Sequence, residues 1–320
     1  MKELIEPTFQ DILAARLNVY RFLKPTPLYQ YSGLSELLGT QVWVKHENHL
    51  PVGAFKVRGG INFVAGMTKQ ERRAGLFTAS TGNHGQSIAY AAQQYGVKAT
   101  IAVPEQANPH KVAAMRGLGA KVVFYGADFD EARQWIAEQS SRESGYFVGP
   151  TDPSLICGVG TYAVEIVEAL PDVETIIVPV GAGSGACGVC IVAKSINPKI
   201  QVIAAQSAQA PANQLSWATG KHVTAPTNTF AEGVATRVPF ENTQCILRRY
   251  LDDFVLVDDQ EIKTAIRLLL EHTHNLAEGA GAVSLAAALK LKDRLAQRKT
   301  VIVLSGGNLL LDSLKKILVP

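Results

Sequence analysis

The run Thr175-Ile176-Ile177-Val178-Pro179-Val180, followed by Gly181-Ala182-Gly183-Ser184-Gly185, decides the fold class of this 320-residue chain. An unbroken apolar run of this kind is typical of a parallel strand that is buried on both faces. A glycine-rich turn after such a strand, before a helix expected from about Ala186, indicates a strand-loop-helix unit of an α/β sheet.

Short β-branched runs of the same type recur along the chain and alternate with helical patterns. The predicted strands are 41–45, 76–79, 100–103, 121–125, 175–180, 201–205, 254–257 and 300–304. Helical patterns at 130–140, 160–169 and 261–272 lie between some of them. This alternation predicts α/β layers with mostly parallel sheets and right-handed crossovers.

The domain organisation follows from the lack of any linker or repeat in the sequence. A second domain must be joined by short connections, near residues 50–53 and 148–153. We therefore expect a large domain of residues 1–50 and 150–320, with a small inserted domain of residues 51–149. The chain ends soon after its last predicted strand, so we expect no regulatory domain.

Composition and charge argue against several classes of protein. The net charge is only +3 and no basic stripe is present, so nucleic acid is not an expected partner. Residues 1–7 do not resemble a signal peptide, and no apolar run approaches the roughly 18 residues that a membrane helix needs. Cys187 and Cys190 lack the second pair that a zinc site requires. We expect reduced cysteines in a cytoplasmic protein.

The segment Gly53-Ala54-Phe55-Lys56-Val57-Arg58-Gly59-Gly60 carries the strongest functional signal. Glycines around Lys56 allow its amine to approach a planar ligand, because they remove obstructing side chains. An amine with an ordinary pKa of about 10.4 becomes nucleophilic near neutral pH only when burial or a cation lowers that pKa. Schiff-base chemistry with an aldehyde is then possible. In isolation, the segment would be better explained as a surface turn that carries a lysine and an arginine.

Two further loops follow predicted strands, at the edge where ligands collect in parallel sheets. Ser80-Thr81-Gly82-Asn83-His84-Gly85-Gln86 offers hydroxyls, an amide and free N–H groups for an anion, although a simple helix cap would also explain its first residues. Ser305-Gly306-Gly307-Asn308 places a hydroxyl where it can meet a flat heterocycle, but alone it would be taken for a turn.

The loop at 181–185 has two possible ligands. Its backbone amides are suited to a phosphate. The pattern from Gly183 to Gly188 also matches G-x-G-x-x-G, which is found in dinucleotide-binding units. However, Gln206 ends the next strand, where such a unit would place an acidic residue for the ribose. We therefore favour a phosphate site over an NAD-dependent dehydrogenase.

Taken together, these residues resemble the fold-type II pyridoxal-phosphate enzymes, specifically the serine/threonine dehydratase and serine racemase group. The likeness extends from about Leu23 to the C-terminus. The matching segments are Lys24-Pro25-Thr26-Pro27-Leu28, Phe55-Lys56-Val57-Arg58-Gly59, Gly82-Asn83-His84-Gly85-Gln86, Gly158-Val159-Gly160-Thr161, residues 181–185 and Ser305-Gly306-Gly307-Asn308. The resemblance implies two three-layer αβα domains, as in the tryptophan synthase β-like fold, the larger of which binds pyridoxal 5'-phosphate.

The resemblance also implies roles for individual residues. Lys56 would hold the cofactor as a Schiff base and move the substrate's α-proton, while Phe55 lies against the ring and Asn83 bonds its phenolic oxygen. Residues 181–185 would hold the phosphate, Ser305 would face the ring nitrogen, and Glu278 would lie near the ring. The substrate carboxylate would be bound by the loop of Ser80, Thr81, Gly82, Asn83 and His84.

The implied reaction is the β-elimination of a small β-hydroxy amino acid, such as L-threonine or L-serine, to a 2-oxo acid and ammonia. A neutral Ser305 hydroxyl does not hold the ring nitrogen protonated, which favours prompt loss of a β-substituent over a long-lived carbanion. The alternatives within the family are a serine racemase and a 3-hydroxyaspartate ammonia-lyase. From other classes, an NAD-dependent dehydrogenase or an amino-acid-binding protein would leave Lys56 unused. The resemblance further implies a homo-oligomer, either a dimer or a tetramer.

The chain departs from the family pattern at several positions. Ala54 replaces a usual serine, and Ala182 and Ser184 replace glycines of the phosphate loop. Gln206 and Ala212 stand where cation-binding members have carboxylates, so we expect no metal site. Thr81 takes the place of the racemase serine, which puts racemase activity in doubt.

Overall fold

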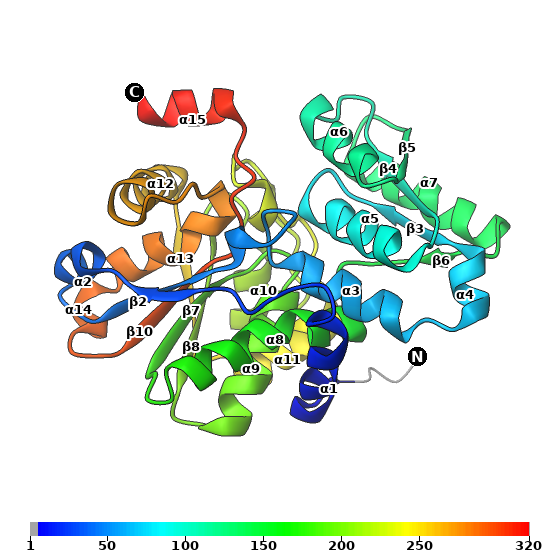
Figure 1. Cartoon of the computed structure of the whole chain (residues 1–320). Coiled ribbons are helices and arrows are strands. Elements are labelled where there is room, and N and C mark those ends of the chain that lie inside the picture. Colours follow the sequence, from blue (N-terminus) through cyan, green and yellow to red (C-terminus); the bar gives the residue numbers. More distant parts are fainter. Residues whose placement is uncertain (1–5, 320) are drawn as a thin grey trace.

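A computed structural model describes residues 6–319 (Figure 1). Residues 1–5, which belong to the segment that does not resemble a signal peptide, lie outside this range. The strands are β1 (Leu28–Gln30), β2 (Val42–His46), β3 (Leu76–Ala79), β4 (Ala99–Val103), β5 (Lys121–Phe124), β6 (Tyr146–Phe147), β7 (Thr175–Pro179), β8 (Gln201–Ser207), β9 (Asp253–Val257) and β10 (Thr300–Leu304).

Helices cover these strands on both faces. They are α1 (Phe9–Val19), α2 (Ser32–Leu38), α3 (Lys56–Gly66), α4 (Lys69–Ala74), α5 (Asn83–Tyr95), α6 (Pro109–Gly117), α7 (Phe129–Arg142), α8 (Pro153–Ala169), α9 (Ser184–Ile196), α10 (Ala212–Thr219), α11 (Glu241–Tyr250), α12 (Asp259–Thr273), α13 (Gly279–Lys290), α14 (Lys292–Leu295) and α15 (Leu311–Leu318). Two short 3₁₀ helices, η1 (Glu47–His49) and η2 (Glu232–Val234), lie in connecting segments.

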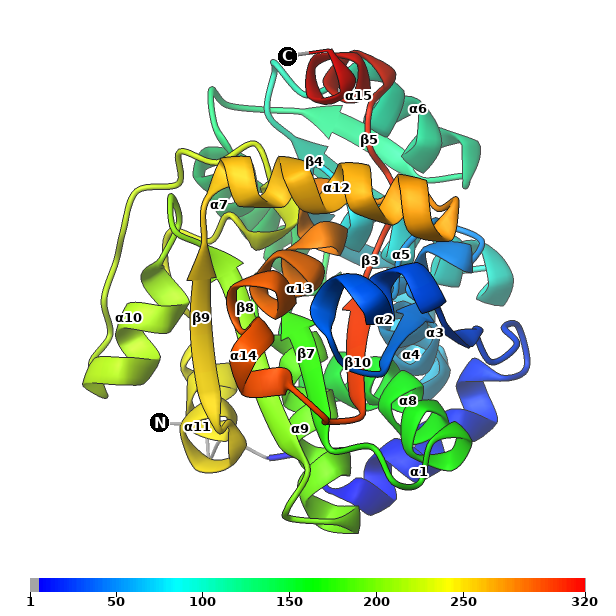
Figure 2. The ribbon, with the colours of Figure 1, turned by 90° about the vertical axis from the view of Figure 1, so that its left-hand side faces the viewer.

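The strands form two separate sheets, which lie side by side in Figure 1, whereas Figure 2 views the molecule from the side of the larger sheet. The larger sheet has the order β1-β2-β10-β7-β8-β9, and its strands are parallel except for β1, which pairs with β2 in the antiparallel sense. The smaller sheet has the order β5-β4-β3-β6 and is parallel throughout. Its strands come from a segment between β2 and β7. The predicted α/β class with mostly parallel sheets is confirmed.

The eight predicted strands are all present, and each boundary agrees to within two residues. The sequence reading missed β1 and β6, which are only three and two residues long. Helix α8 begins at Pro153, seven residues before the predicted pattern, because Asp152 caps it and accepts the N–H of Ser154 at 2.8 Å. Helix α5 also begins early, at Asn83 rather than near Gln86.

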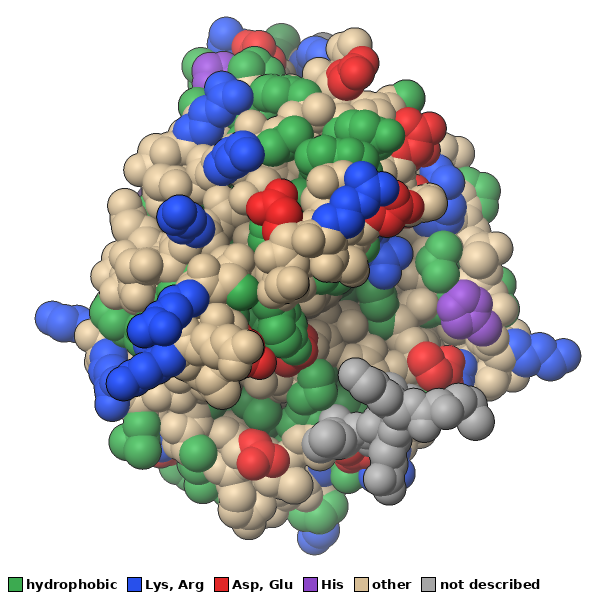
Figure 3. All heavy atoms as spheres, turned by 90° about the vertical axis from the view of Figure 1, so that its right-hand side faces the viewer, with side chains coloured by type: hydrophobic (Ala, Val, Ile, Leu, Met, Phe, Trp, Pro, Cys, Tyr) green, Lys and Arg blue, Asp and Glu red, His purple; other side chains and the backbone are tan. Residues whose placement is uncertain are grey.

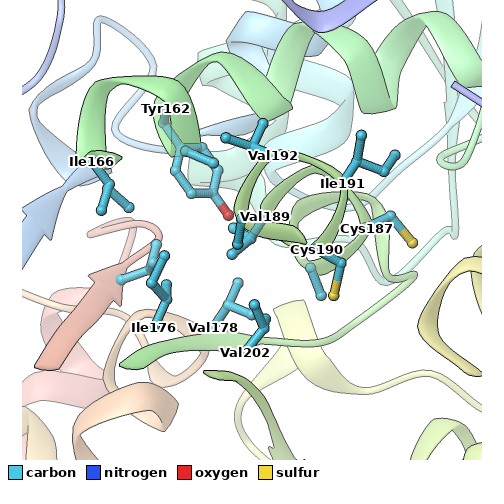
Figure 4. Close-up of a cluster of buried hydrophobic side chains, with 14 of the residues drawn as sticks. Tyr162, Ile166, Ile176, Val178, Cys187, Val189, Cys190, Ile191, Val192 and Val202 are labelled. Atoms are coloured by element: carbon cyan, nitrogen blue, oxygen red, sulfur yellow. The ribbon is translucent and has the colours of Figure 1, made fainter. Parts of the chain in front are cut away.

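The larger sheet is buried on both faces, as the apolar run at 175–180 predicts. Ile176 and Val178 of β7 face α8 and α9, whereas Ile177 packs on the opposite side with α12 and α13. Figure 4 shows the first of these two cores, in which Cys187 and Cys190 of α9 are buried. Both thiols are free. They are therefore core side chains, one turn apart on one helix.

Close contacts between glycines bring the helices beside the sheets together. A Cβ atom on Gly158 of α8 would lie 2.4 Å from the Arg58 carbonyl oxygen of α3. A Cβ atom on Gly60 would lie 2.6 Å from the Ser87 carbonyl oxygen of α5, and one on Gly188 of α9 would lie 2.7 Å from the Gly160 Cα atom. These glycines form a continuous seam, in which α3 fits between α5 and α8 without side chains to separate the backbones.

A buried cluster of charges lies beside this seam. The Arg58 guanidinium, fully buried, donates to Glu47 Oε2 at 2.7 Å and to Glu165 Oε1 at 2.6 Å. Lys45 also pairs with Glu165 and donates to the carbonyl oxygen of Thr26 at 2.7 Å. Two cations and two carboxylates are thus paired in the interior, which is the condition under which buried charge is tolerated.

The cluster joins four parts of the chain that lie far apart in the sequence. Thr26 precedes β1, Lys45 lies in β2 and Glu47 begins η1 directly after it, Arg58 lies in α3, and Glu165 lies in α8. These partners hold the pKa of the Glu165 carboxyl below its ordinary value despite its burial, which by itself raises that pKa.

The surface shown in Figure 3 carries basic and acidic side chains interspersed, without a continuous basic stripe on that face. Of the helices within residues 6–319, none has both the length and the apolar character required to cross a bilayer.

Replacement of Glu165 by glutamine should destabilise the fold strongly, because it leaves two buried cations with one carboxylate. We expect the free energy of unfolding to fall by about 3–5 kcal/mol. The matched control is Glu168→Gln on the same helix, since Glu168 is 53% exposed in its pair with Arg16. That variant should lose less than about 1 kcal/mol. Urea denaturation of both variants measures the difference.

Wild type and Glu165→Gln should differ in how their free energies of unfolding depend on pH. Because folding lowers the pKa of Glu165, its stabilising contribution is present above the ordinary glutamate pKa of about 4.3 and is lost in acid. The gap in unfolding free energy between wild type and Glu165→Gln should therefore narrow as the pH falls below 4.3 or so. A gap that stays constant or widens would contradict this account of the cluster.

Candidate active site

Three neighbouring parallel strands carry the glycine-rich loops to one edge of the larger sheet. Strands β2, β10 and β7 are neighbours in that order. After β2 the chain continues towards Lys56, after β10 it enters Ser305, and after β7 it continues towards Gly181. Parallel strands present their carboxyl ends at the same edge, where ligands bind in such sheets. The structure thus brings the Lys56 segment to the same edge as two of the predicted loops, those that begin at Gly181 and Ser305.

Lys56 is the first residue of α3 and is tied to the loop that follows β10. Ala54 forms an isolated antiparallel bridge with Gly306, and the Phe55 N–H donates to the Ser305 carbonyl oxygen at 3.0 Å. Gly53 has a φ of +68°, a backbone conformation that favours glycine. Backbone contacts therefore fix the segment before Lys56 against the end of β10.

The Lys56 amine has an altered proton affinity. Burial lowers its pKa to about 8, and the carboxylate of Glu278 partly opposes this effect by raising it. The Lys56 Nζ atom lies 4.9 Å from the centre of the Phe55 ring. Neutral amine is therefore available near physiological pH, which nucleophilic and proton-transfer chemistry both require.

Glu278 and Asn83 form a polar pair next to Lys56. The Asn83 Nδ2 group donates to Glu278 Oε1 at 2.6 Å. Burial raises the pKa of Glu278 to about 7, although the Asn83 donor acts in the opposite direction and lowers it. Glu278 precedes α13, and its N–H donates to the Gly306 carbonyl oxygen at 3.1 Å. Glu278 is thus tied to Gly306, which also pairs with Ala54 in the segment before Lys56.

The segment from Ser80 to His84 links the end of β3 to α5. The Ser80 hydroxyl accepts the N–H groups of Gly82 at 3.2 Å and of Gly85 at 2.8 Å, so its side chain caps the helix start. Thr81 is half-buried, and its hydroxyl has no hydrogen-bond partner recorded within residues 6–319. At this helix start, backbone N–H groups and the Thr81 hydroxyl are the groups suited to an anion.

His84 is a neutral side chain in this segment. Burial, with a smaller contribution from the charge of Lys56, lowers the pKa of His84 to about 4. Its Nε2 atom lies 3.3 Å from the carbonyl oxygen of Val148, which only accepts, so Nε2 carries the hydrogen. His84 therefore contributes no positive charge near pH 7.

The loop of Gly181, Ala182 and Gly183 leads into α9, which begins at Ser184. Gly183 has a φ of +100°. The carbonyl oxygens of Gly181 and Ala182 accept from Asn213 Nδ2 at 2.8 Å and Thr243 Oγ1 at 2.9 Å. These bonds fix the loop, and the first N–H groups of α9, which have no acceptor within the helix, are suited to an anionic ligand.

The space above the sheet edge is shaped by the absence of side chains. A Cβ atom on Gly185 would lie 3.1 Å from the Phe55 ring, and one on Gly306 would lie 2.5 Å from Glu278 Oε1. The buried Ser305 hydroxyl donates to the Ala280 carbonyl oxygen at 3.4 Å, a long contact that leaves its lone pairs for another donor. A reactive amine, an anion-binding helix start and a neutral hydroxyl together fit an aromatic aldehyde that bears a phosphate.

Other ligands fit this site less well. Gly188, the third glycine of the dinucleotide-like pattern, is explained by its contact with Gly160 in the seam. The buried Gln206 amide donates to Val234 O at 3.4 Å and accepts from the N–H of Gln214 at 3.2 Å, so it serves the protein's own backbone. Within residues 6–319, no group of three His, Cys, Asp or Glu side chains is placed to hold a metal ion.

Three residues of the site were missed by the sequence reading. Asn213 and Thr243 hold the loop of residues 181–183, and Asn308 donates to Asn83. Asn213 and Thr243 lie in helices at positions without any motif. Asn308 was within the quoted Ser305-Gly306-Gly307-Asn308 segment, so its presence in a glycine loop was the available signal.

Comparisons with known proteins agree with this geometry. The family model described as "Pyridoxal-phosphate dependent enzyme" matches residues 19–306. The chain is 39% identical to an L-threonine ammonia-lyase of Thermotoga maritima, covering 97% of this chain and 78% of that protein. It is 35% identical to an L-threo-3-hydroxyaspartate ammonia-lyase of Saccharomyces cerevisiae, covering 95% of this chain and 94% of that protein.

Solved structures give the same result. The processed form of threonine deaminase isoform 2 from Solanum lycopersicum superimposes with a TM-score of 0.91 at 32% identity, covering 98% of this chain and 96% of that one. Serine racemase from Dictyostelium discoideum superimposes with a TM-score of 0.89 at 34% identity, covering 95% and 99%. With a family model that spans most of its length and relatives above 30% identity, the chain belongs to the family of pyridoxal-phosphate dependent enzymes.

Proposed function

We propose that this protein is a pyridoxal-phosphate dependent ammonia-lyase that converts a small β-hydroxy amino acid, such as L-threonine or L-serine, to a 2-oxo acid and ammonia. The observation that carries the proposal is the buried Lys56 amine, with a pKa of about 8, on a segment whose neighbouring Phe55 contacts both Ser305 at the end of β10 and Gly185. The similarity to L-threonine ammonia-lyase and threonine deaminase supports the same reaction.

The cofactor, when bound, supplies an electron sink for the substrate's Cα. In this proposal Lys56 holds the cofactor's aldehyde carbon, and later its neutral amine removes the proton from Cα. The amides at the start of α9 bind the phosphate, with Gly181 and Ala182 held by side chains behind them. The Asn83 amide would donate its remaining N–H to the ring oxygen, and the Ser305 hydroxyl would meet the ring nitrogen without a formal charge.

The substrate carboxylate is assigned to the start of α5. Backbone N–H groups of the segment from Ser80 to His84 and the Thr81 hydroxyl bind it, while the neutral His84 closes the site without competing for the anion. The β-hydroxyl then leaves with one proton as water. Hydrolysis consumes one water and releases ammonia, so the net products are the 2-oxo acid and ammonia.

Finer properties belong to the same proposal. We assign residues 1–50 and 150–320 to a large cofactor-binding domain and residues 51–149 to a small one, because each sheet has its own buried cores. We also propose a cytoplasmic homo-oligomer, a dimer or tetramer, in agreement with the resemblance to the family.

Two alternatives from the same family have some support. Serine racemase activity is favoured by the similarity to the Dictyostelium protein, and 3-hydroxyaspartate elimination by the similarity to the yeast enzyme. The second carboxylate of 3-hydroxyaspartate would need a cation in the site. Lys111, whose charge acts on Glu278, is already paired with Glu232, which argues against the dicarboxylic substrate.

Lys56→Ala should abolish both turnover and the visible absorption of the bound cofactor, because no other amine in the described structure occupies the edge of β10 and β7. Borohydride reduction of the wild-type holoenzyme followed by peptide mapping should label Lys56. Lys69→Ala, at an exposed position of α4, is the control and should keep both properties. Label on a different lysine would refute the assignment.

Thr81 should decide the balance between elimination and racemisation. Reprotonation of Cα on the face opposite Lys56 needs an acid there, and the extra methyl of threonine stiffens χ1 and crowds Cα. On L-serine we expect far more 2-oxo acid than D-serine. Thr81→Ser should raise the racemised fraction, and Thr81→Ala should remove it while elimination largely persists. Mainly D-serine from wild type, or equal loss of both products in Thr81→Ala, would count against this role.

Activity should not depend on a divalent cation at the position of Gln206 and Ala212. A neutral amide bonded to the backbone and a methyl group offer no charged oxygen to such an ion. EDTA and added magnesium should each change the initial rate and the melting temperature only slightly. The measurement uses holoenzyme dialysed against chelator. A several-fold activation by magnesium, retained in Gln206→Ala, would indicate a site elsewhere.

A further inference from the structure

Asn308 connects three segments of the site. It lies four residues beyond the end of β10. Its Nδ2 group donates to the carbonyl oxygen of Val52 at 2.8 Å and to Asn83 Oδ1, also at 2.8 Å. A Cβ atom on Gly53 would lie 2.6 Å from Asn308 Oδ1, so the segment before Lys56 packs directly on this amide. Asn308 therefore joins the approach to Lys56 with the first residue of α5.

The direction of these hydrogen bonds is determined by the backbone. The Val52 carbonyl oxygen only accepts, so the atom of Asn308 that faces it must be the nitrogen. The same NH₂ group faces Asn83, whose nearest atom must then be the acceptor Oδ1. The orientation of the Asn83 amide is in this way set by a carbonyl group that it does not touch.

The Asn83 amide presents its NH₂ group on the opposite side. One hydrogen is given to Glu278 Oε1 at 2.6 Å. An amide nitrogen carries two hydrogens, so a second donor is available for another acceptor. With the reverse orientation, Asn83 would present an oxygen to the carboxylate of Glu278 and to any acceptor on a ligand, which leaves acceptors facing each other.

We propose that Asn308 is a positioning residue that fixes the Asn83 amide with its donor towards the cofactor's ring oxygen and Glu278. The inference rests on the proposed function, in which Asn83 bonds that oxygen. Asn308 touches neither the cofactor nor the substrate in this proposal. It acts by excluding one of the two orientations of the Asn83 side chain.

Asn308→Asp is the sharpest variant, since an ionised carboxylate has nearly the same shape but cannot donate. It repels the Val52 carbonyl oxygen and attracts the Asn83 NH₂ group, so Asn83 should turn its oxygen towards the cofactor. Asn308→Ala removes the control without imposing the reverse orientation, so its effect should be smaller. The alanine variant also provides a test if the aspartate variant does not fold.

Asn62→Asp is the matched control. The Asn62 Nδ2 group donates to the Ser154 carbonyl oxygen at 2.8 Å, and its Oδ1 atom accepts from Asn18 Nδ2 at 2.9 Å. It therefore shares with Asn308 a backbone carbonyl acceptor and a second asparagine. Asn62 lies in α3 beyond Lys56 and bonds to none of the site residues. Any general loss of stability that an aspartate causes at a half-buried asparagine position should appear in both variants.

The experiment titrates apoprotein with pyridoxal phosphate and records the dissociation constant, the visible absorption of the bound cofactor and the melting temperature of the apoprotein. We expect Asn308→Asp to weaken cofactor binding at least tenfold or so, the size of one hydrogen bond to a charged group. The visible fraction at neutral pH should fall, because an acceptor beside the ring oxygen favours its O–H form. Asn308→Ala should lie between wild type and Asn308→Asp, and Asn62→Asp should bind as wild type does.

The role of Asn308 is overturned if Asn308→Asp and Asn62→Asp bind the cofactor equally well with equal spectra, whatever their melting temperatures. If Asn308→Asp does not fold, the role is also overturned when Asn308→Ala binds the cofactor with the affinity and spectrum of wild type. A wild-type protein that gives no visible band with pyridoxal phosphate would refute the proposed function and this inference with it. A normal wild-type band with unchanged Asn308 variants would remove the inference alone.

Discussion

The pairing of Arg58 with Glu47 and Glu165 is the interaction on which the position of Lys56 depends. Arg58 lies two residues after Lys56 in α3, and its guanidinium is fully buried between carboxylates from η1 and α8. Isolated charges would be expelled from such an interior. Because each group here has its partner, the cluster instead fixes the rotation of α3 about its axis. The lysine at the first position of that helix is thereby aimed at the sheet edge.

Burial affects the ionisable groups of the candidate active site differently from those of the cluster around Arg58. Around Arg58, two cations and two carboxylates are paired with each other. At Lys56 and Glu278, burial moves the two pKa values towards each other, to about 8 and about 7. A proton therefore costs little to place on either group near neutral pH. One part of the molecule uses burial to fix charge, and the other uses it to make a proton transferable.

Much of the fold was predictable because its signals are local. The apolar run of β7, its glycine loop and the alternation of strands with helices depend on residues close together in the chain. Asp152 followed by Pro153 was a local start signal for α8 that was overlooked, since Gly158 and Gly160 weaken the helical pattern after it. The strands β1 and β6 are too short to produce a pattern, and they exist only because β2 and β3 are there to pair with them.

The parts of the site that could not be predicted depend on contacts between distant segments. Lys56, Asn83 and Ser305 stood in motifs. By contrast, Thr26 in the Lys24-Pro25-Thr26-Pro27 motif contributes to the ion cluster, where its hydroxyl donates to Glu47 at 2.6 Å. The role of Asn308 likewise depends on Val52, which is 256 residues away in the sequence. The spacing of residues in the sequence identifies neither Glu47 as the partner of Thr26 nor Val52 as the partner of Asn308.

The glycine seam has a consequence for protein engineering. At Gly60 and Gly158 the backbones of α3, α5 and α8 approach so closely that an added Cβ atom would meet a carbonyl oxygen. The Ser87 hydroxyl, which donates to the Lys56 carbonyl oxygen at 2.6 Å, lies at the same contact with Gly60. Engineering of a new substrate range should therefore leave these glycines unchanged and vary the loops opposite Lys56 instead.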